Sequence, residues 1–360
     1  MNFDLSEEQE MFRSSVERFA APVDVEARRK LRLSPAGYHR ERWSQLAELG
    51  LIALAASEDA GGIGGSPVDL ALISEAIGTA NAPDPLLENG ILPALLLDRG
   101  GATDALESVL SGEQIATLAW AERAQRYSIE AKGVKAEASG DSFRLTGEKT
   151  FVMGALLADL LIVTAESDGE TACFLLPKDS DGVEVRAYRL TDGSIAGEVK
   201  LTRAAASIKL DLSPKQLAEI VSEARLYAAA EMVGLGQRLL DDTLAYVKER
   251  EQFGVAIGSF QALQHRLVEA YAKIEQCRSM LYRAALADRA DSAEWQRAIA
   301  GAKAFIGENV DAIAREAVQM HGGMGITDEL AIGHAMKRVM VLARLFGDTD
   351  TALAEYSRAA

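Results

Sequence analysis

Apolar residues recur every three or four positions through the first part of the chain, up to about residue 112. This spacing places them on one face of a helix, as in "ERWSQLAELGLIALAA" and "VDLALISEAIGTA". The stretch "SEEQEMFRSSVERFA" opens with a serine followed by acidic residues, which is typical of a capped helix start. The glycine-rich "EDAGGIGGSP" at 58–67 predicts a loop, and because no strand precedes it and no GK[ST] follows, a phosphate-binding turn is disfavoured.

The period changes between about residues 113 and 210. Short alternating or apolar runs appear here, namely "SFRLTGEK", "LLIVTA", "TACFLLP", "GVEVRAYRL" and "GEVKLT". Glycine, aspartate and serine separate these runs, which is typical of strands joined by turns. The pattern predicts a small β domain.

Helical spacing returns after "LDLSPKQLAEIV", where Ser213 and Pro214 supply a helix cap and a first-turn proline. Breaks at about 254–258, 289–293 and 322–327 divide the remainder into four long helices. Four long helices with short connections are typical of a bundle.

The pattern therefore predicts a mainly α fold with a central β domain. We expect an N-terminal helical domain at 1–112, a β-barrel or sandwich domain at 113–210 and a C-terminal four-helix bundle at 211–360. A chain of 360 residues is long enough to bury a sizeable core in these domains.

Composition excludes several classes of partner. The formal net charge is −16 with acidic side chains spread along the chain, which argues against nucleic acid and anionic membranes. No apolar run approaches the ~20 residues of a membrane span, and the acidic start resembles neither a signal nor a transit peptide. We therefore expect a soluble cytoplasmic protein without a membrane span.

Metal and disulfide sites are not indicated either. Cys173 and Cys277 lie far apart, without the spacing of metal ligands, and are expected to be buried thiols. His265, His321 and His334 also lack metal-ligand spacing, so packing or hydrogen bonding is the expected role of each.

Candidate chemistry begins with "REQFGVAIGSFQALQH" at 250–265. Arg250 offers a planar fork of donors suited to a phosphate, Gln252 an amide, Phe253 a stacking face and Gly254 a backbone that a ligand can approach. This combination suits a nucleotide. The alternative is a helix C-terminus with a glycine stop and an arginine near the negative end of the helix dipole.

A second stretch, "QMHGGMGITDE" at 319–329, strengthens the nucleotide interpretation. Gln319 and His321 stand beside Gly322 and Gly323, again combining polar groups with accessible backbone. Two such stretches in one bundle predict a nucleotide-cofactor site.

These two stretches resemble the C-terminal signatures of the acyl-CoA dehydrogenases. The resemblance covers the whole chain, including "LSEEQ", "SEDAGGIGGSPVDLALISEAIG" and "LTGEK" in helix–β–helix order. It implies dimers of dimers with FAD across a subunit interface. In that arrangement one chain surrounds the flavin ring with its β domain and base, while its neighbour holds the pyrophosphate and adenosine.

The resemblance implies that the neighbour's half of the FAD site is intact in this chain. Arg250 would hold the pyrophosphate region and Phe253 would pack near the adenine. The complete set of implied FAD-binding residues is Arg250, Gln252, Phe253, Ile257, Phe260, Gln261, Gln319, Gly322 and Gly323.

The flavin-ring half departs from the family pattern. The family's T-E-P-G-A-G-S-D-like loop corresponds to "AERAQRYS" at 121–128, so Ala121 lacks the hydroxyl, Arg126 fills a glycine position and Tyr127 replaces a small serine. The family's W-I-[TS]-N-G corresponds to "FVMGA", so Phe151 replaces the tryptophan and Met153 the hydroxyl. The polar contacts that the family makes with the flavin ring are therefore missing.

The catalytic base is missing as well. The family's glutamate removes the α-proton of an acyl-CoA thioester while the β-hydrogen leaves as hydride to the flavin. Counting from Gln319 places Phe346 or Gly347 at the common position of this glutamate. Some members carry the catalytic glutamate instead on the helix before the "REQFG" stretch, where this chain has Ala224. Glu223 is one residue earlier and so lies about 100° around that helix from this position.

Two other carboxylates are candidates for this role. Asp348 is a candidate base because relatives that oxidise nitroalkanes use an aspartate, although an aspartate after a helix end is more often a turn residue. Glu231 lies in the apolar "AAAEMVGLGQ", a setting that suggests a tuned pKa, but buried carboxylates are usually paired, here with a neighbouring arginine.

The leading hypothesis is a base-lacking subunit of a heteromeric FAD-dependent acyl-CoA dehydrogenase. It would form a heterotetramer with a second, complete acyl-CoA dehydrogenase-like chain, carry half the usual number of flavins and act on an acyl-CoA substrate such as a steroid side-chain or dicarboxylic thioester. The alternatives are a self-sufficient dehydrogenase or oxidase using Asp348, and a flavin-free scaffold on the same fold. The motifs identify neither the acyl group nor the electron acceptor.

Overall fold

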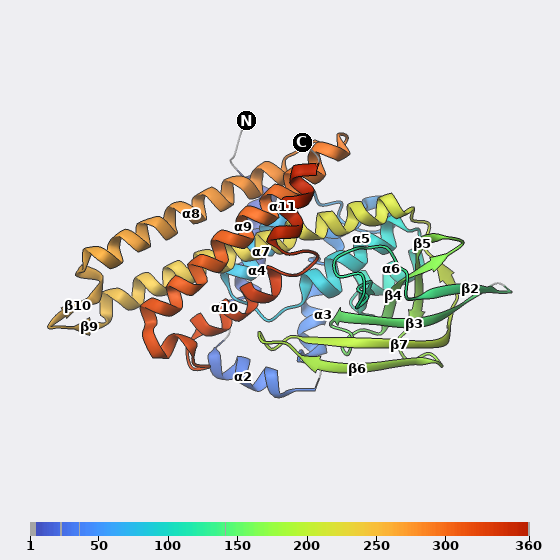
Figure 1. The fold of residues 1–360 in the computed structure, drawn as a ribbon, viewed down its shortest axis with the longest axis horizontal. Coiled ribbons are helices and arrows are strands. Elements are labelled where there is room, and N and C mark those ends of the chain that lie inside the picture. Colours follow the sequence, from blue (N-terminus) through green and yellow to red (C-terminus); the bar gives the residue numbers. More distant parts are fainter. Residues whose placement is uncertain (1–4, 22–23, 36, 141, 359–360) are drawn as a thin grey trace. The chain divides into compact units, whose positions relative to one another are not determined.

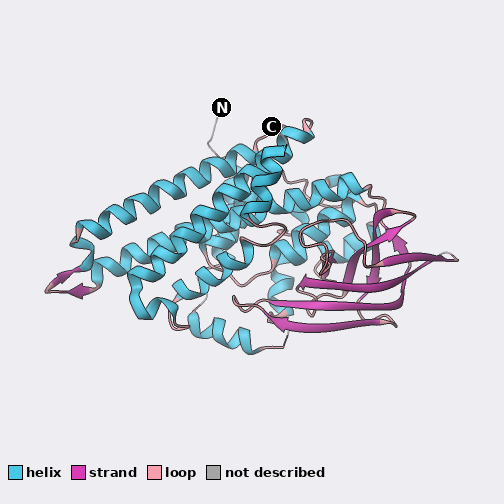
Figure 2. Ribbon diagram, viewed as in Figure 1, coloured by secondary structure: helices cyan, strands magenta, loops and turns pink. Residues whose placement is uncertain are grey.

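The computed structural model describes residues 5–21, 24–35, 37–140 and 142–358. The chain forms two compact units, and both units draw on separate parts of the sequence. The bundle unit contains residues up to Lys30, Pro67–Ala82 and Arg225 onwards, and the sheet unit contains Leu31–Ser66 and Pro83–Ala224. Figures 1 and 2 show the helices of the bundle unit and the strands of the sheet unit.

Within the described residues, the bundle unit consists of helices and their connections, and its only strands form one short hairpin. Its helices are α1 (Glu7–Phe19), α4 (Pro67–Thr79), most of α7 (Pro214–Glu249), α8 (Gln261–Ala285), α9 (Ser292–His321), α10 (Ala331–Leu342) and α11 (Thr349–Arg358), with α2 (Val25–Leu33) at the boundary between the units. Short 3₁₀ turns η4 (Ile257–Ser259) and η5 (Gly322–Ile326) precede α8 and follow α9. The long helices lie side by side in Figure 1.

The predicted helix starts and breaks are present in the bundle unit and at its border. Ser6 and Gln9 form a reciprocal capping box at α1, and the Ser213 hydroxyl accepts from the Gln216 amide where α7 begins. The three predicted breaks separate α7, α8, α9 and α10. The fourth predicted helix is interrupted once more, between α10 and α11.

The sheet unit combines short helices with one large sheet. Its helices are α3 (Arg40–Glu48), the 3₁₀ turns η1 (Ala53–Ala55) and η2 (Glu58–Ala60), the π-helical turn η3 (Leu86–Ile91), α5 (Leu92–Arg99) and α6 (Thr103–Leu110). Its strands are β1 (Ala116–Ala119), β2 (Lys135–Ser139), β3 (Ser142–Met153), β4 (Leu160–Ser167), β5 (Glu170–Pro177), β6 (Val183–Arg189), β7 (Ile195–Ala206) and β8 (Ile208–Lys209).

The strands form an eight-stranded sheet in the order β6-β7-β3-β2-β4-β5-β8, with β1 parallel to β4. Leu145, Val163 and Val199 contribute to a single apolar core, and the Phe143 and Phe174 rings meet at 4.9 Å. The mainly α fold with a central β domain is confirmed. No helix within the described residues is long and apolar enough to cross a bilayer.

Candidate cofactor site

The two nucleotide-like stretches lie at the same end of the bundle unit. The Tyr246 ring on α7 stacks on the His321 ring at the end of α9, with centroids 4.2 Å apart and planes at 24°. Tyr246 precedes Arg250 by one helical turn, and His321 follows Gln319 by two residues. This stack brings the stretches together. Sequence reasoning identified both stretches but did not identify Tyr246.

The first stretch is a β-hairpin that extends from the end of α7. Strands β9 (Glu251–Gln252) and β10 (Val255–Ala256) pair in antiparallel register, with Gln252 opposite Val255. Phe253 and Gly254 form the two-residue turn, with φ of +57° and +80°. Such turns need positive φ at both positions, which explains the glycine. The alternative interpretation as a helix C-terminus is correct in part, because α7 ends at Glu249 and Arg250 follows directly. Gly254, however, forms the hairpin turn and does not stop the helix.

The hairpin presents its side chains to solvent. Phe253 is 92% exposed and its ring meets that of Phe260 edge-on at a centroid distance of 6.2 Å. Arg250 and Gln261 are exposed, and the Arg250 carbonyl accepts from the Ile257 amide at 2.8 Å, which closes the base of the hairpin. A cation, two amides and an aromatic face are thus available on one short segment.

The second stretch provides accessible backbone. Gly322 follows α9 as its C-cap with φ +61° and ψ −144°, a backbone conformation that residues other than glycine rarely adopt. Its amide donates to the Gln319 carbonyl. Open space surrounds the position that a Cβ would occupy at Gly322 and at Gly323. Gln319 is exposed beside them. A ligand can therefore approach this backbone closely.

These residues fit the adenosine and pyrophosphate end of FAD. A guanidinium fork suits a diphosphate, an exposed aromatic ring suits a purine, and bare glycine backbone suits close contact with either. We call the nine residues listed above, from Arg250 to Gly323, the clamp.

The ring-side loop lies in the sheet unit. Arg126, at the glycine position of the family loop, adopts φ +51°, and its guanidinium lies 5.5 Å from the centroid of the Tyr127 ring. Phe151 adopts φ +53°, and the Met153 carbonyl accepts from the Thr117 hydroxyl at 2.6 Å. Ala121 and Met153 occupy the two positions at which the family resemblance implies a hydroxyl side chain.

A buried ion pair anchors this loop and was not identified from the sequence. Lys149 Nζ donates to Glu122 Oε1 at 2.7 Å, to Thr164 Oγ1 at 2.9 Å and to the Trp120 carbonyl at 3.1 Å. Burial lowers the pKa of Lys149 to about 8. Burial opposes the charge of Glu122, but hydrogen bonds from Lys149 and from backbone amides outweigh it and hold the Glu122 pKa below its usual value.

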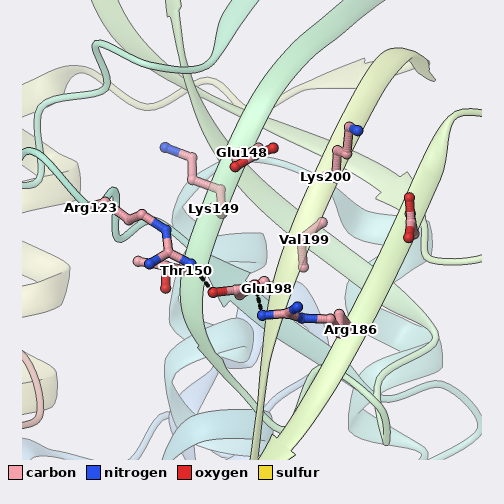
Figure 3. A pocket seen from close by; sticks show the side chains of 9 residues that line it. Arg123, Glu148, Lys149, Thr150, Arg186, Glu198, Val199 and Lys200 are labelled. Carbon is pink, nitrogen blue, oxygen red and sulfur yellow. Dashed lines mark hydrogen bonds and ion pairs between the residues drawn. The ribbon is translucent and has the colours of Figure 1, made fainter.

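A small hollow lies against strands β3, β6 and β7 beside this loop (Figure 3). Arg123 from the loop and Arg186 from β6 both form ion pairs with Glu198 on β7. The hollow has a volume of about 170 Å³. Cofactor pockets usually occupy about 300 to 1,000 Å³, so this hollow is too small to hold a flavin by itself.

The expected positions of the base carry no carboxylate. Phe346 is buried with φ +60°, and its carbonyl accepts from Arg225 Nε at 2.7 Å. Gly347 follows it, and Ala224 is fully buried. Glu223, one residue before Ala224, forms a 2.7 Å ion pair with Arg99.

The two other carboxylates have structural partners. Asp348 Oδ1 accepts from the Thr351 amide at 2.9 Å and from its hydroxyl at 2.6 Å, and so caps α11. Glu231 makes a two-pronged pair with Arg338, at 2.7 and 3.0 Å, as expected for a buried carboxylate. His321 Nδ1 and His334 Nε2 contact backbone carbonyls of Ala317 and Asp328.

Lys303 gives this region a predictable pH dependence. Its buried ammonium donates to the Leu342 carbonyl, and burial with the nearby Arg225 charge lowers its pKa from 10.5 to about 7. Between about pH 7 and 10.5 the unfolded chain therefore binds more protons than the folded chain, so this group makes the free energy of unfolding rise with pH. Urea titrations of the wild type and Lys303→Met should show a smaller rise in the variant, and identical pH profiles would contradict this assignment.

The chain is similar to known proteins over nearly its whole length. Family models match for the acyl-CoA dehydrogenase N-terminal domain (residues 6–115), middle domain (117–203) and C-terminal domain (215–360). The acyl-CoA dehydrogenase IpdE2 of Mycolicibacterium smegmatis is 32% identical over 95% of this chain and 96% of its own.

Two solved structures are also similar. The steroid ACAD Tcur3481–Tcur3483, as a G363A variant, has 28% identity, a TM-score of 0.88 and coverage of 98% of this chain and 97% of its own. A chain of the ChsE4–ChsE5 complex from Mycobacterium tuberculosis has 28% identity, a TM-score of 0.88 and coverage of 99% and 98%.

Proposed function

Because this chain belongs to the acyl-CoA dehydrogenase family of oxidoreductases, we propose that it is the base-lacking subunit of a heteromeric FAD-dependent acyl-CoA dehydrogenase. Its clamp would complete the FAD site of a second, complete acyl-CoA dehydrogenase-like chain. The three-domain division at 112/113 and 210/211 belongs to the same proposal.

One contrast carries this proposal. The residues of the clamp are exposed apart from the half-buried Ile257, whereas Phe346, Gly347 and Ala224 stand where a catalytic glutamate would be. The carboxylates nearest in sequence to these positions already have partners: Glu223 forms an ion pair with Arg99, and Asp348 accepts a hydrogen bond from Thr351. In an assembly of this chain alone, each FAD would be bound at its adenosine and pyrophosphate end, but its flavin ring would lack both polar contacts and a catalytic base.

The role of this chain is to bind and orient. Arg250 would neutralise the pyrophosphate, Phe253 and Phe260 would cover the adenine, and Gln319 with the glycine backbone after it would fix the register of the cofactor. When bound, FAD supplies the acceptor for the hydride that leaves the acyl β-carbon. Removal of the α-proton would be performed by a carboxylate of the other chain.

The relatives support a two-chain assembly and a bulky acyl group. The ChsE4–ChsE5 complex and the Tcur3481–Tcur3483 steroid ACAD are each named for two chains. By this analogy we propose a heterotetramer with two copies of each chain and a steroid side-chain or similarly bulky acyl-CoA as substrate.

Purification of the chain alone and with a co-expressed second acyl-CoA dehydrogenase chain tests the proposal. We expect no retained FAD in the lone chain and one FAD for each pair of unlike chains in the complex, measured by visible absorbance against protein mass. Full flavin occupancy together with turnover by the lone chain would overturn the proposal.

The second candidate, a self-sufficient enzyme using Asp348, makes a different prediction. Because Asp348 caps α11, Asp348→Asn retains a capping side chain and should leave the turnover of the complex and its stability nearly unchanged. Asp348→Ala should cost about 1 kcal/mol of unfolding free energy, again without loss of turnover. A large loss of turnover in both variants, with folding intact, would instead support Asp348 as the base.

A further inference from the structure

A pair of stacked rings lies behind the clamp without belonging to it. The Tyr246 side chain on α7 is half-buried, and the His321 side chain at the end of α9 is only 5% exposed. The two rings face one another with centroids 4.2 Å apart. By contrast, the clamp side chains of Arg250, Phe253 and Gln319 are exposed. An effect of the ring pair on a cofactor would therefore act through its neighbours in the chain.

Tyr246 is connected to the hairpin through the last turn of α7. The Arg250 amide donates to the Tyr246 carbonyl at 2.8 Å, so helical hydrogen bonding continues to the first clamp residue. After the hairpin, Gly258 returns to the same turn, because a Cβ on it would lie 2.9 Å from the Val247 carbonyl oxygen. The Ile257 amide donates to the Arg250 carbonyl and closes the hairpin between these two points. The hairpin is therefore fixed to the helix turn that carries Tyr246.

His321 is connected in the same way to the second stretch. Its Nδ1 lies 2.8 Å from the Ala317 carbonyl oxygen. Because a carbonyl only accepts, Nδ1 carries a proton and donates, which fixes the ring against the last turn of α9. The 3₁₀ turn η5 folds back beside it, since a Cβ on Gly325 would lie 3.1 Å from the His321 Cβ. The bare backbone of Gly322 and Gly323 belongs to this turn, so its position follows that of the ring.

The relative position of the two stretches determines how well they bind one ligand. Each stretch continues from the end of a different helix, where backbone hydrogen bonding is incomplete and helices fray. A ligand that contacts both stretches binds more tightly when their positions are set beforehand, because ordering them on binding costs free energy. Stacked aromatic rings provide a contact with a preferred geometry. The Tyr246–His321 stack joins the two helix ends and can provide this order.

We propose that Tyr246 is a positioning residue for FAD, which holds the hairpin beside the second stretch by stacking on His321. This inference rests on the proposed function, because it assigns Tyr246 a part in the binding of FAD by the clamp. Tyr246 acts on Arg250 and on the backbone after His321, and through them on the cofactor. It takes no part in proton or hydride transfer, which occurs at the flavin end.

Titration of FAD into the two-chain complex, after removal of its own FAD, tests this role, with binding followed by flavin fluorescence. Tyr246→Leu removes the stack and should weaken FAD binding by roughly three- to tenfold, the range expected for an aromatic pair. Tyr246→Phe keeps the ring and should restore most of the affinity. Turnover lost in Tyr246→Leu should return as FAD is added, because the variant lowers affinity and leaves the catalytic carboxylate of the other chain in place.

A double-mutant cycle separates positioning from a general loss of stability. In the Arg250→Ala background the hairpin no longer binds the pyrophosphate, so its position matters less and Tyr246→Leu should cost little further affinity. General destabilisation would instead reduce FAD binding by the same factor in both backgrounds. Tyr282→Leu on α8 is the matched control and should bind FAD as the wild type does. Tyr282 is also half-buried but lies roughly 30 Å along that helix from Gln261.

Three results would each overturn the positioning role: wild-type affinity in Tyr246→Leu, equal losses in both backgrounds, or failure of Tyr246→Phe to restore binding. Failure of the proposed function has a different signature. If Arg250→Ala kept all of its FAD, the clamp would be rejected together with the role of Tyr246. If Arg250→Ala released FAD while Tyr246→Leu kept it, the inference about Tyr246 alone would be rejected.

Discussion

Arg250→Ala is expected to release FAD from the two-chain complex. A guanidinium bound to a diphosphate contributes about 1.5 to 3 kcal/mol per charged hydrogen bond, so its removal should weaken FAD binding on the order of tenfold to a hundredfold. Arg250 lies exposed on the β9–β10 hairpin, so the stability of the chain should change by less than about 0.5 kcal/mol. Flavin absorbance per mole of complex after gel filtration measures the effect.

Two further variants sharpen this experiment. Arg250→Lys keeps the charge but not the planar fork and should retain an intermediate amount of FAD. Arg315→Ala removes an exposed arginine of α9 that lies outside the clamp, so the complex should retain all of its FAD. Unchanged flavin content in Arg250→Ala would reject the clamp and favour a flavin-free scaffold.

Lys149→Met is expected to destabilise the sheet unit by about 3 to 5 kcal/mol, because it leaves the Glu122 carboxylate buried without its cation. Such a loss is a large part of the stability of an ordinary domain. Urea unfolding followed by circular dichroism gives the value. The destabilisation should arise in the sheet unit because the Lys149–Glu122 pair connects the loop at 121–128 to strands β3 and β4.

The matched control is Lys135→Met, which breaks the exposed pair between Lys135 and Glu166 and should cost less than about 1 kcal/mol. The double variant Lys149→Met with Glu122→Gln removes both buried charges and should recover part of the loss. Equal effects of Lys149→Met and Lys135→Met would contradict the assigned importance of the buried pair.

Local signals were sufficient for much of the fold. Helical spacing, the Ser213 cap and the change to short strands after about residue 113 are properties of neighbouring residues, and the structure contains the corresponding elements. The pairing of Glu231 with an arginine could also be expected, because a buried carboxylate needs a counter-charge. Its partner could not be named, since Arg338 lies 107 positions away.

The geometry of the candidate site depends on contacts that sequence spacing does not encode. The β-hairpin at the end of α7 was not predicted, because its strands are only two residues long. The meeting of the two clamp stretches depends on Tyr246 stacking on His321, a contact between residues 75 positions apart. The roles of the clamp residues toward FAD remain predictions.

The hairpin turn itself shows a compromise between folding and use. Asparagine followed by glycine is the favoured pair for such a turn, whereas this chain places Phe253, at φ +57°, before Gly254. A left-handed phenylalanine strains the backbone by about 1 kcal/mol or more, and the ring gains little from its own chain because it is 92% exposed. Phe253→Asn should thus raise the free energy of unfolding of the isolated chain and weaken its contribution to FAD binding in the complex. This would be a trade-off between stability and activity at a single residue.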